Sequence, residues 1–126
     1  MMKRTAACLL ALCSLTAAAQ EAGPALKVLE ADGVPHFSEC GTFYFLAARG
    51  SPSIRYDEFY SAGEFAFNAA ILLRGRETAD RMQSEIAARL MQEMSNDWQK
   101  IAVLDQKYRG KCDALLKSAG YEYAPR

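Results

Sequence analysis

The chain has 126 residues, of which 51% are hydrophobic and 24% are charged. This balance is ordinary for a globular protein and excludes disordered, collagen-like and low-complexity classes. Fifteen basic residues balance fifteen acidic ones, so the chain lacks the excess positive charge that binding to nucleic acid or to an anionic membrane surface exploits. We therefore expect no nucleic-acid partner.

Residues 1–19 have the three-part layout of a secretory signal peptide. Lys3 and Arg4 precede an apolar stretch, and three consecutive alanines end at Ala19. The stretch is too short to span a bilayer, and no later segment has the roughly 20 apolar residues that a membrane span needs. We expect cleavage after Ala19 and export of the remaining 107 of 126 residues. The destination that we prefer is a bacterial periplasm, with full secretion left open.

The four residues ending at Cys13 resemble a bacterial lipobox. Leu12 stands where that signal needs a small residue, so an unlipidated exported protein is preferred over a lipoprotein anchored at Cys13. Removal of the leader takes two basic residues away and leaves thirteen basic against fifteen acidic, a net charge of −2.

Two cysteines, Cys40 and Cys112, remain after cleavage. An exported chain meets an oxidising compartment, and two cysteines allow one intramolecular pairing. Cys40 shares a helical face with Phe37 and Tyr44, and Cys112 lies on the apolar stripe described below. We predict a Cys40–Cys112 disulfide worth on the order of 4 kcal/mol. Neither cysteine belongs to a Cys-x-x-Cys motif, which excludes a thioredoxin-type enzyme.

The segment 20–36 is a predicted irregular lead-in, followed by a single helical domain over 37–126. Its Leu26, Val28 and Leu29 belong either to a short helix that begins at Pro24 or to a hairpin that turns at Asp32-Gly33. Both alternatives stay open. From Phe37 to Arg49 the pattern predicts a helix, since Gly50 provides a C-terminal stop and Pro52 prevents its continuation.

The next predicted helix begins between Ser53 and Ser61 and ends at Gly75. Ser61 and Glu64 have the spacing of a capping box at its start. The following run 65–73 is apolar on both sides, so we expect this helix to be the most enclosed of the domain. Asn68 within the run would then need hydrogen-bond partners.

The stretch 77–118 reads as helix almost throughout. A single rod of this length would measure about 63 Å, longer than a compact domain of this size, so we expect a break at residues 95–97 with Asn96 capping the second helix. Gly110 is a weaker candidate for a kink. One apolar stripe advances by threes and fours: Met82, Ile86, Leu90, Met94, Trp98, Ile101, Leu104, Tyr108, Cys112, Leu115 and Ala119. Four acid–base pairs at i,i+4 support the outer face: Glu77–Arg81, Glu85–Arg89, Asp105–Arg109 and Asp113–Lys117.

Together these elements predict an all-α fold, a small antiparallel bundle of about four helices stapled by one disulfide. The aromatic residues of 43–45, 59–60 and 65–67 are predicted to form its core, with a ligand groove as the alternative. Met82, Met91 and Met94 are predicted to be packing residues.

Catalytic and cofactor motifs are absent from the sequence, which holds no phosphate loop, zinc-protease motif or nucleophile elbow. His36, Glu39 and Cys40 have ligand spacing, but a metal site needs three or four ligands and Cys40 has a better partner. We predict no catalytic residue, metal or cofactor. Arg74, Arg76 and Arg81 form a possible partner-binding patch, whose alternative explanation is helix-dipole complementation and solubility.

By elimination, we expect a non-catalytic exported protein that acts by protein–protein binding, such as an inhibitor, an immunity protein or a small chaperone, as a monomer or homodimer. One alternative is a carrier of a small molecule or metal with an interhelical site near Glu64 and Asn68. Another is a small hydrolase, for which the adjacent carboxylates Asp57 and Glu58 and the inward candidate Glu64 are the available acids.

Overall fold

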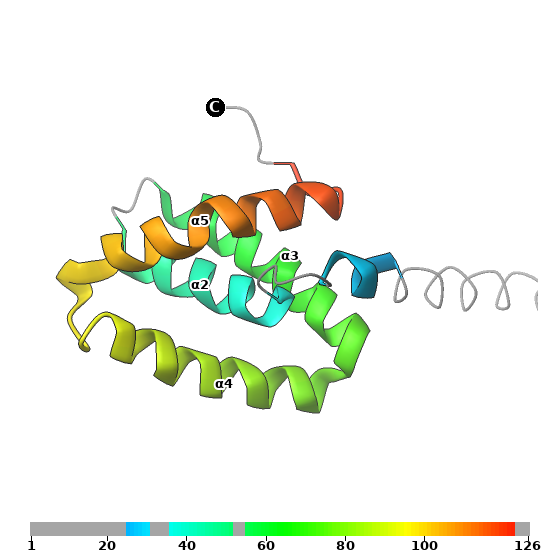
Figure 1. The fold of residues 1–126 in the computed structure, drawn as a ribbon, viewed down its shortest axis with the longest axis horizontal. Helices are drawn as coiled ribbons and strands as arrows, with labels where there is room; N and C mark the ends of the chain where they lie inside the picture. The colour runs from blue at the N-terminus through cyan, green and yellow to red at the C-terminus, as the bar shows by residue number, and fades with distance from the viewer. Residues whose placement is uncertain (1–24, 31–35, 52–54, 123–126) are drawn as a thin grey trace, which may run out of the picture.

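The computed structural model describes residues 25–30, 36–51 and 55–122. Within these ranges the chain contains helices and no strand, as predicted. The helices are α2 (Phe37–Gly50), α3 (Tyr56–Arg74), α4 (Arg76–Glu93), the short 3₁₀ helix η2 (Trp98–Lys100) and α5 (Ile101–Ser118). The four long helices run in alternating directions (Figure 1). The expected signal peptide, residues 1–19, lies outside the described residues.

A helical turn at residues 25–29 precedes the bundle. The helical alternative therefore holds for Leu26, Val28 and Leu29, whereas the turn considered at Asp32-Gly33 lies outside the described residues. Leu26 and Leu29 pack against the core, but Val28 is 72% exposed.

The most enclosed helix is α2, which corrects the prediction for residues 65–73. Ten of its fourteen residues are buried, because α3, α4 and α5 all pack against it. Helix α3 packs one of its sides against α2. The other side of α3 lies at the surface, where Leu72 is 57% exposed and Asn68 is exposed too. Asn68 therefore needs no buried partner.

Two glycines bring α2 and α3 close together. A Cβ atom on Gly41 would lie 3.2 Å from the backbone nitrogen of Phe67 and 3.4 Å from the carbonyl oxygen of Gly63. A Cβ atom on Gly63 would lie 2.8 Å from the ring of Phe45. The ring of Phe45 therefore rests on the backbone of α3, a position that a larger residue at 63 would deny it.

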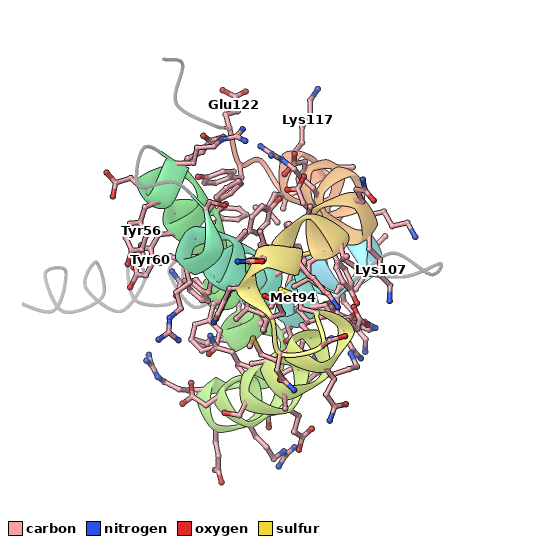
Figure 2. All side chains as sticks on the ribbon, turned by 90° about the vertical axis from the view of Figure 1, so that its left-hand side faces the viewer. Tyr56, Tyr60, Met94, Lys107, Lys117 and Glu122 are labelled. Atoms are coloured by element: carbon pink, nitrogen blue, oxygen red, sulfur yellow. A yellow bond between two sulfur atoms is a disulfide. The ribbon has the colours of Figure 1, made fainter. Side chains whose placement is uncertain are left out.

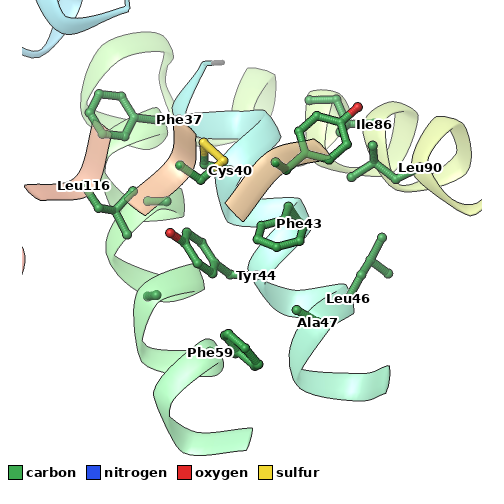
Figure 3. Packing of buried hydrophobic residues seen from close by; sticks show 14 of the residues in the cluster. Phe37, Cys40, Phe43, Tyr44, Leu46, Ala47, Phe59, Ile86, Leu90 and Leu116 are labelled. Atoms are coloured by element: carbon green, nitrogen blue, oxygen red, sulfur yellow. A yellow bond between two sulfur atoms is a disulfide. The ribbon is translucent and has the colours of Figure 1, made fainter. Parts of the chain in front are cut away.

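The predicted disulfide joins α2 to α5. Cys40 and Cys112 are bonded with their Cα atoms 5.4 Å apart, and both residues are completely buried. Figure 3 shows the bond in the core beside Phe37 and Leu116. The staple therefore fixes the first long helix to the last across 72 positions of sequence.

The helix starts and ends follow the predicted breaks more closely than the predicted caps. Gly75 ends α3 with φ +83°, and its N–H donates to the carbonyl oxygen of Ile71 at 2.8 Å. The capping-box prediction is wrong, because α3 begins at Tyr56 and places Ser61 inside the helix. The break at residues 95–97 is confirmed, but Asn96 does not cap. Asp97 does, since its carboxylate accepts from the N–H of Gln99 at 3.0 Å.

Most of the predicted apolar stripe is core. Its fully or nearly buried members are Ile86, Leu90, Met94, Leu104, Tyr108, Cys112 and Leu115. Trp98 is 37% exposed, because the chain leaves helical phase at the break between α4 and α5. Met94 is buried, and Met82 and Met91 pack against the core as predicted.

The predicted helical ion pairs form only in part. Arg109 lies 3.5 Å from Asp105, as the i,i+4 spacing predicted. Arg89 instead pairs with Glu39 of α2 at 2.9 Å. An ion pair between two helices is therefore preferred over the predicted pair within α4.

Helix α4 is attached along a narrow line of contact. Three of its eighteen residues, Ala79, Ile86 and Leu90, are buried. Both of its ends have residues with positive φ, namely Gly75 on one side and Ser95 and Asn96 (φ 56° and 55°) on the other. Near its C-terminal end, the hydroxyl of Tyr108 lies 3.0 Å from each carboxylate oxygen of Glu93. Burial and then this hydrogen bond raise the pKa of Tyr108, and the contact ties α4 to α5.

Candidate binding surface

The three arginines of the predicted patch have different surroundings. Nη2 of Arg74 lies 2.5 Å from Oε1 of Glu30 and 3.1 Å from Nδ1 of His36. Oε2 of the buried Glu30 also accepts the N–H of Phe37 at 2.8 Å. Arg74 therefore belongs to a structural ion cluster that holds the start of α2 against the end of α3.

Arg76 and Arg81 are exposed on the first turns of α4. Neither belongs to the ion cluster of Arg74, Glu30 and His36. A role for the three arginines in binding a partner stays a prediction. Among the described residues, no three His, Cys, Asp or Glu side chains lie close enough to hold a metal ion. No helix of the described ranges is long and apolar enough to cross a membrane.

The aromatic residues divide between the core and the surface. Phe43, Tyr44 and Phe59 are buried, as the core prediction required. Another group forms a row of rings across α2 and α3. Its members, which we call the aromatic row, are Tyr56, Tyr60, Phe45 and Phe67, with successive ring centroids 5.6, 5.4 and 6.5 Å apart.

The two tyrosines of the aromatic row face outward. Tyr56 and Tyr60 are 43% and 41% exposed, and their rings stack with an interplanar angle of 14°. One helical turn separates them on α3, which is why their rings can stack. Figure 2 shows the pair together on the outer side of the bundle. Neither hydroxyl has a hydrogen-bond partner among the described residues.

Two adjoining hollows follow the aromatic row. One has a volume of about 360 Å³ and is lined by Phe45, Tyr56, Tyr60 and Arg49 among others. The second, of about 480 Å³, extends past Phe67 toward α4. Both are bordered by Phe45, Tyr60 and Gln83. We call the combined depression, between the α2–α3 pair and α4, the aromatic groove.

The two ends of the aromatic groove differ in charge. At one end stands Arg49, which is exposed and has no carboxylate within ion-pair distance among the described residues. Its guanidinium carbon lies 5.9 Å from the ring centroid of Trp98, at the limit of a cation–π contact. At the other end Arg76 is accompanied by the carboxylates of Glu64 and Asp80.

Two further hollows have other chemistry. One of about 500 Å³ lies between α2 and α4, where the cations that line it are already engaged, Arg74 with Glu30 and Arg89 with Glu39. A second of about 420 Å³ is apolar and lies between the 25–29 turn, α3 and the end of α5. Leu26, Leu29 and Leu72 line it, and Asn68 supplies an amide.

Comparisons with protein-family models, with curated proteins and with solved structures find no match to this chain.

Sequence reasoning assigned Phe45, Tyr60 and Phe67 to the core and did not single out Tyr56 or Arg49. A signal for the outward tyrosines is nevertheless present in α3. Its buried residues are Phe59, Ala62, Gly63, Ala66, Ala69 and Ala70. Small residues mark the face that lies against α2, and Tyr56 and Tyr60 fall outside that stripe.

Proposed function

We propose that this is a non-catalytic exported protein that binds another protein through the aromatic groove. The observation that carries the proposal is the stacked, exposed pair Tyr56 and Tyr60 beside Arg49, which has no carboxylate partner among the described residues. Tyrosine, tryptophan and arginine dominate the binding energy of protein interfaces, because they combine a large apolar area with a polar or charged group. Inhibitors, immunity proteins and small chaperones are the classes that we favour.

Export is supported by two features of different kinds. The first 19 residues have signal-peptide layout, and the Cys40–Cys112 disulfide is of a type that persists in oxidising compartments. The same disulfide suits a binding protein, since a rigid scaffold loses less conformational entropy when a partner docks.

Site-specific photo-crosslinking in the cells that make the protein tests the proposal. A photoreactive residue replaces Tyr60 in one variant and Tyr56 in a second. In the control variant it replaces Ala114, an exposed residue of α5. We expect a discrete protein adduct from position 60 and none from position 114. Equal adducts from the two positions, or none from position 60 or from position 56, would refute binding through this groove. A cooperative urea-unfolding transition like that of the wild type shows that each variant is folded.

A second candidate is a carrier of a small apolar molecule, which the apolar hollow beside Leu72 favours. Its lining is apolar apart from Asn68 and Ser118, a composition typical of small-molecule sites. Native mass spectrometry of protein purified from its own cells should show a retained ligand that is lost in Leu72→Lys. An unliganded wild-type protein would exclude this candidate.

A further inference from the structure

We propose that the aromatic groove takes an extended segment of the partner protein, with an acidic side chain against Arg49 and proline or aromatic side chains on Tyr56 and Tyr60. This inference rests on the proposed function and specifies the chemistry of the partner. Three features of the groove carry it: the spacing of the rings, the polar groups between them and the charge at one end.

The spacing of the rings fits a short length of extended chain. The ring centroids follow one another at 5.4 to 6.5 Å. Side chains on one face of an extended chain recur at about 6.5 Å, twice the rise of one residue. A segment of about seven residues therefore places alternate side chains on the four successive rings of the row.

Polar groups beside the rings favour an extended occupant over a helical one. The amide of Gln83 borders both hollows and has no hydrogen-bond partner among the described residues. The same holds for the hydroxyls of Tyr56 and Tyr60. An extended segment presents backbone N–H and C=O groups that need such partners, whereas the backbone of a docked helix is satisfied internally.

Charge complementarity gives the segment a direction. Arg49 lies beside Trp98 and has no ion pair within the part of the chain that the structure describes. Guanidinium groups bind carboxylates with two parallel hydrogen bonds. The neighbouring Arg55 already lies 3.9 Å from Glu58. At the other end of the groove, the two carboxylates of Glu64 and Asp80 outnumber the one cation, Arg76, and disfavour a second acid. The acidic residue of the partner therefore lies at the Arg49 end.

A display selection of random dodecapeptides on the mature, disulfide-bonded protein tests this inference. The same library is selected on Arg49→Glu and on Lys111→Glu, which makes the same change of charge on the exposed face of α5. We expect an acidic residue at one fixed position on wild type, a basic residue at that position on Arg49→Glu and the acidic consensus again on Lys111→Glu. The best wild-type peptide should lose at least tenfold in affinity on Arg49→Glu and recover when its acid is changed to lysine.

The outcomes separate this inference from the proposed function. A consensus without an acidic position, or one that Arg49→Glu leaves unchanged, would overturn it. Apolar positions at i, i+3, i+4 and i+7 would identify a helical occupant instead. No enrichment over the Tyr56→Ser/Tyr60→Ser double variant would also overturn it, while crosslinks from position 60 would still uphold protein binding. Arg49→Gln, which reverses no charge at the end of α2, should lose the acidic preference without gaining a basic one.

Discussion

The contribution of the disulfide can be worked out from its place in the chain. It joins Cys40 to Cys112 across 72 positions. For a loop of that length, the chain-entropy model gives a loss of about 15 cal/mol/K in the conformational entropy of the unfolded chain. This loss stabilises the folded state by about 4.4 kcal/mol at 25 °C. Small domains have a total stability of about 5–15 kcal/mol. The reduced protein is therefore expected to be marginally stable.

Urea unfolding of residues 20–126, oxidised and after reduction, measures this contribution without truncating any side chain. We expect the free energy of unfolding to fall by about 4 kcal/mol on reduction. The Cys40→Ala/Cys112→Ala variant should lose more, because both cysteines are completely buried and their truncation leaves a void in the core. Use of residues 20–126, the chain expected after cleavage, leaves Cys8 and Cys13 out of the measurement.

Either of two results would contradict this contribution of the disulfide to stability. One is a loss below about 1 kcal/mol on reduction, which would mean that the unfolded chain is already compact enough to offset the lost constraint. The other is stoichiometric thiol labelling of the native oxidised protein, which would mean that the bond does not form.

Three further predictions concern packing and titration. Leu90→Ala should lower the free energy of unfolding by about 2–5 kcal/mol, because Leu90 is completely buried; a loss near zero would contradict its place in the core. Gly63→Ala should destabilise the protein by about 1–3 kcal/mol, because its Cβ would lie 2.8 Å from the Phe45 ring. The control Gly110→Ala has open space around it and should stabilise α5 by up to about 1 kcal/mol. Equal effects of the two substitutions in urea unfolding would argue against the close contact. Because the pKa of Tyr108 is raised by burial and by Glu93 from 10.0, the folded state keeps a proton that the unfolded state loses above about pH 10. Stability is thus present below that pH and declines as pH rises through the folded pKa, and Tyr108→Phe should make the decline in the urea midpoint shallower; an unchanged slope would count against it.

The features that depend on helical periodicity and on helix-breaking residues could be predicted from the sequence. The stripe containing Leu90 and Leu104 repeats at the helical period, and Gly75 ends a helix because it readily adopts positive φ. The disulfide followed from the small number of cysteines. These features are local or have few alternatives, so one sequence decides them.

The errors concern how helices meet in space. An apolar run on both sides suggested that residues 65–73 would be enclosed. Enclosure depends on how extensively the neighbouring helices pack against a helix, and both α4 and α5 pack more extensively against α2 than against α3. The capping-box pattern at Ser61 is local, and α3 begins before it, at Tyr56. Nothing in the spacing of Phe45 and Tyr60 alone shows that they form one row, because that contact is created where Gly63 brings two helices together.

The narrow attachment of α4 has a consequence for how the molecule opens. Regions with few buried contacts open locally at lower free energy than the whole domain. Helix α4 has three buried residues, whereas α2 and α5 are joined by the disulfide. We expect the backbone amides of α4 to exchange with solvent hydrogen faster than those of α2. An occupant that spans from Tyr60 to Gln83 bridges α3 and α4, so its binding would slow hydrogen exchange along the whole of α4, including turns that the occupant does not touch.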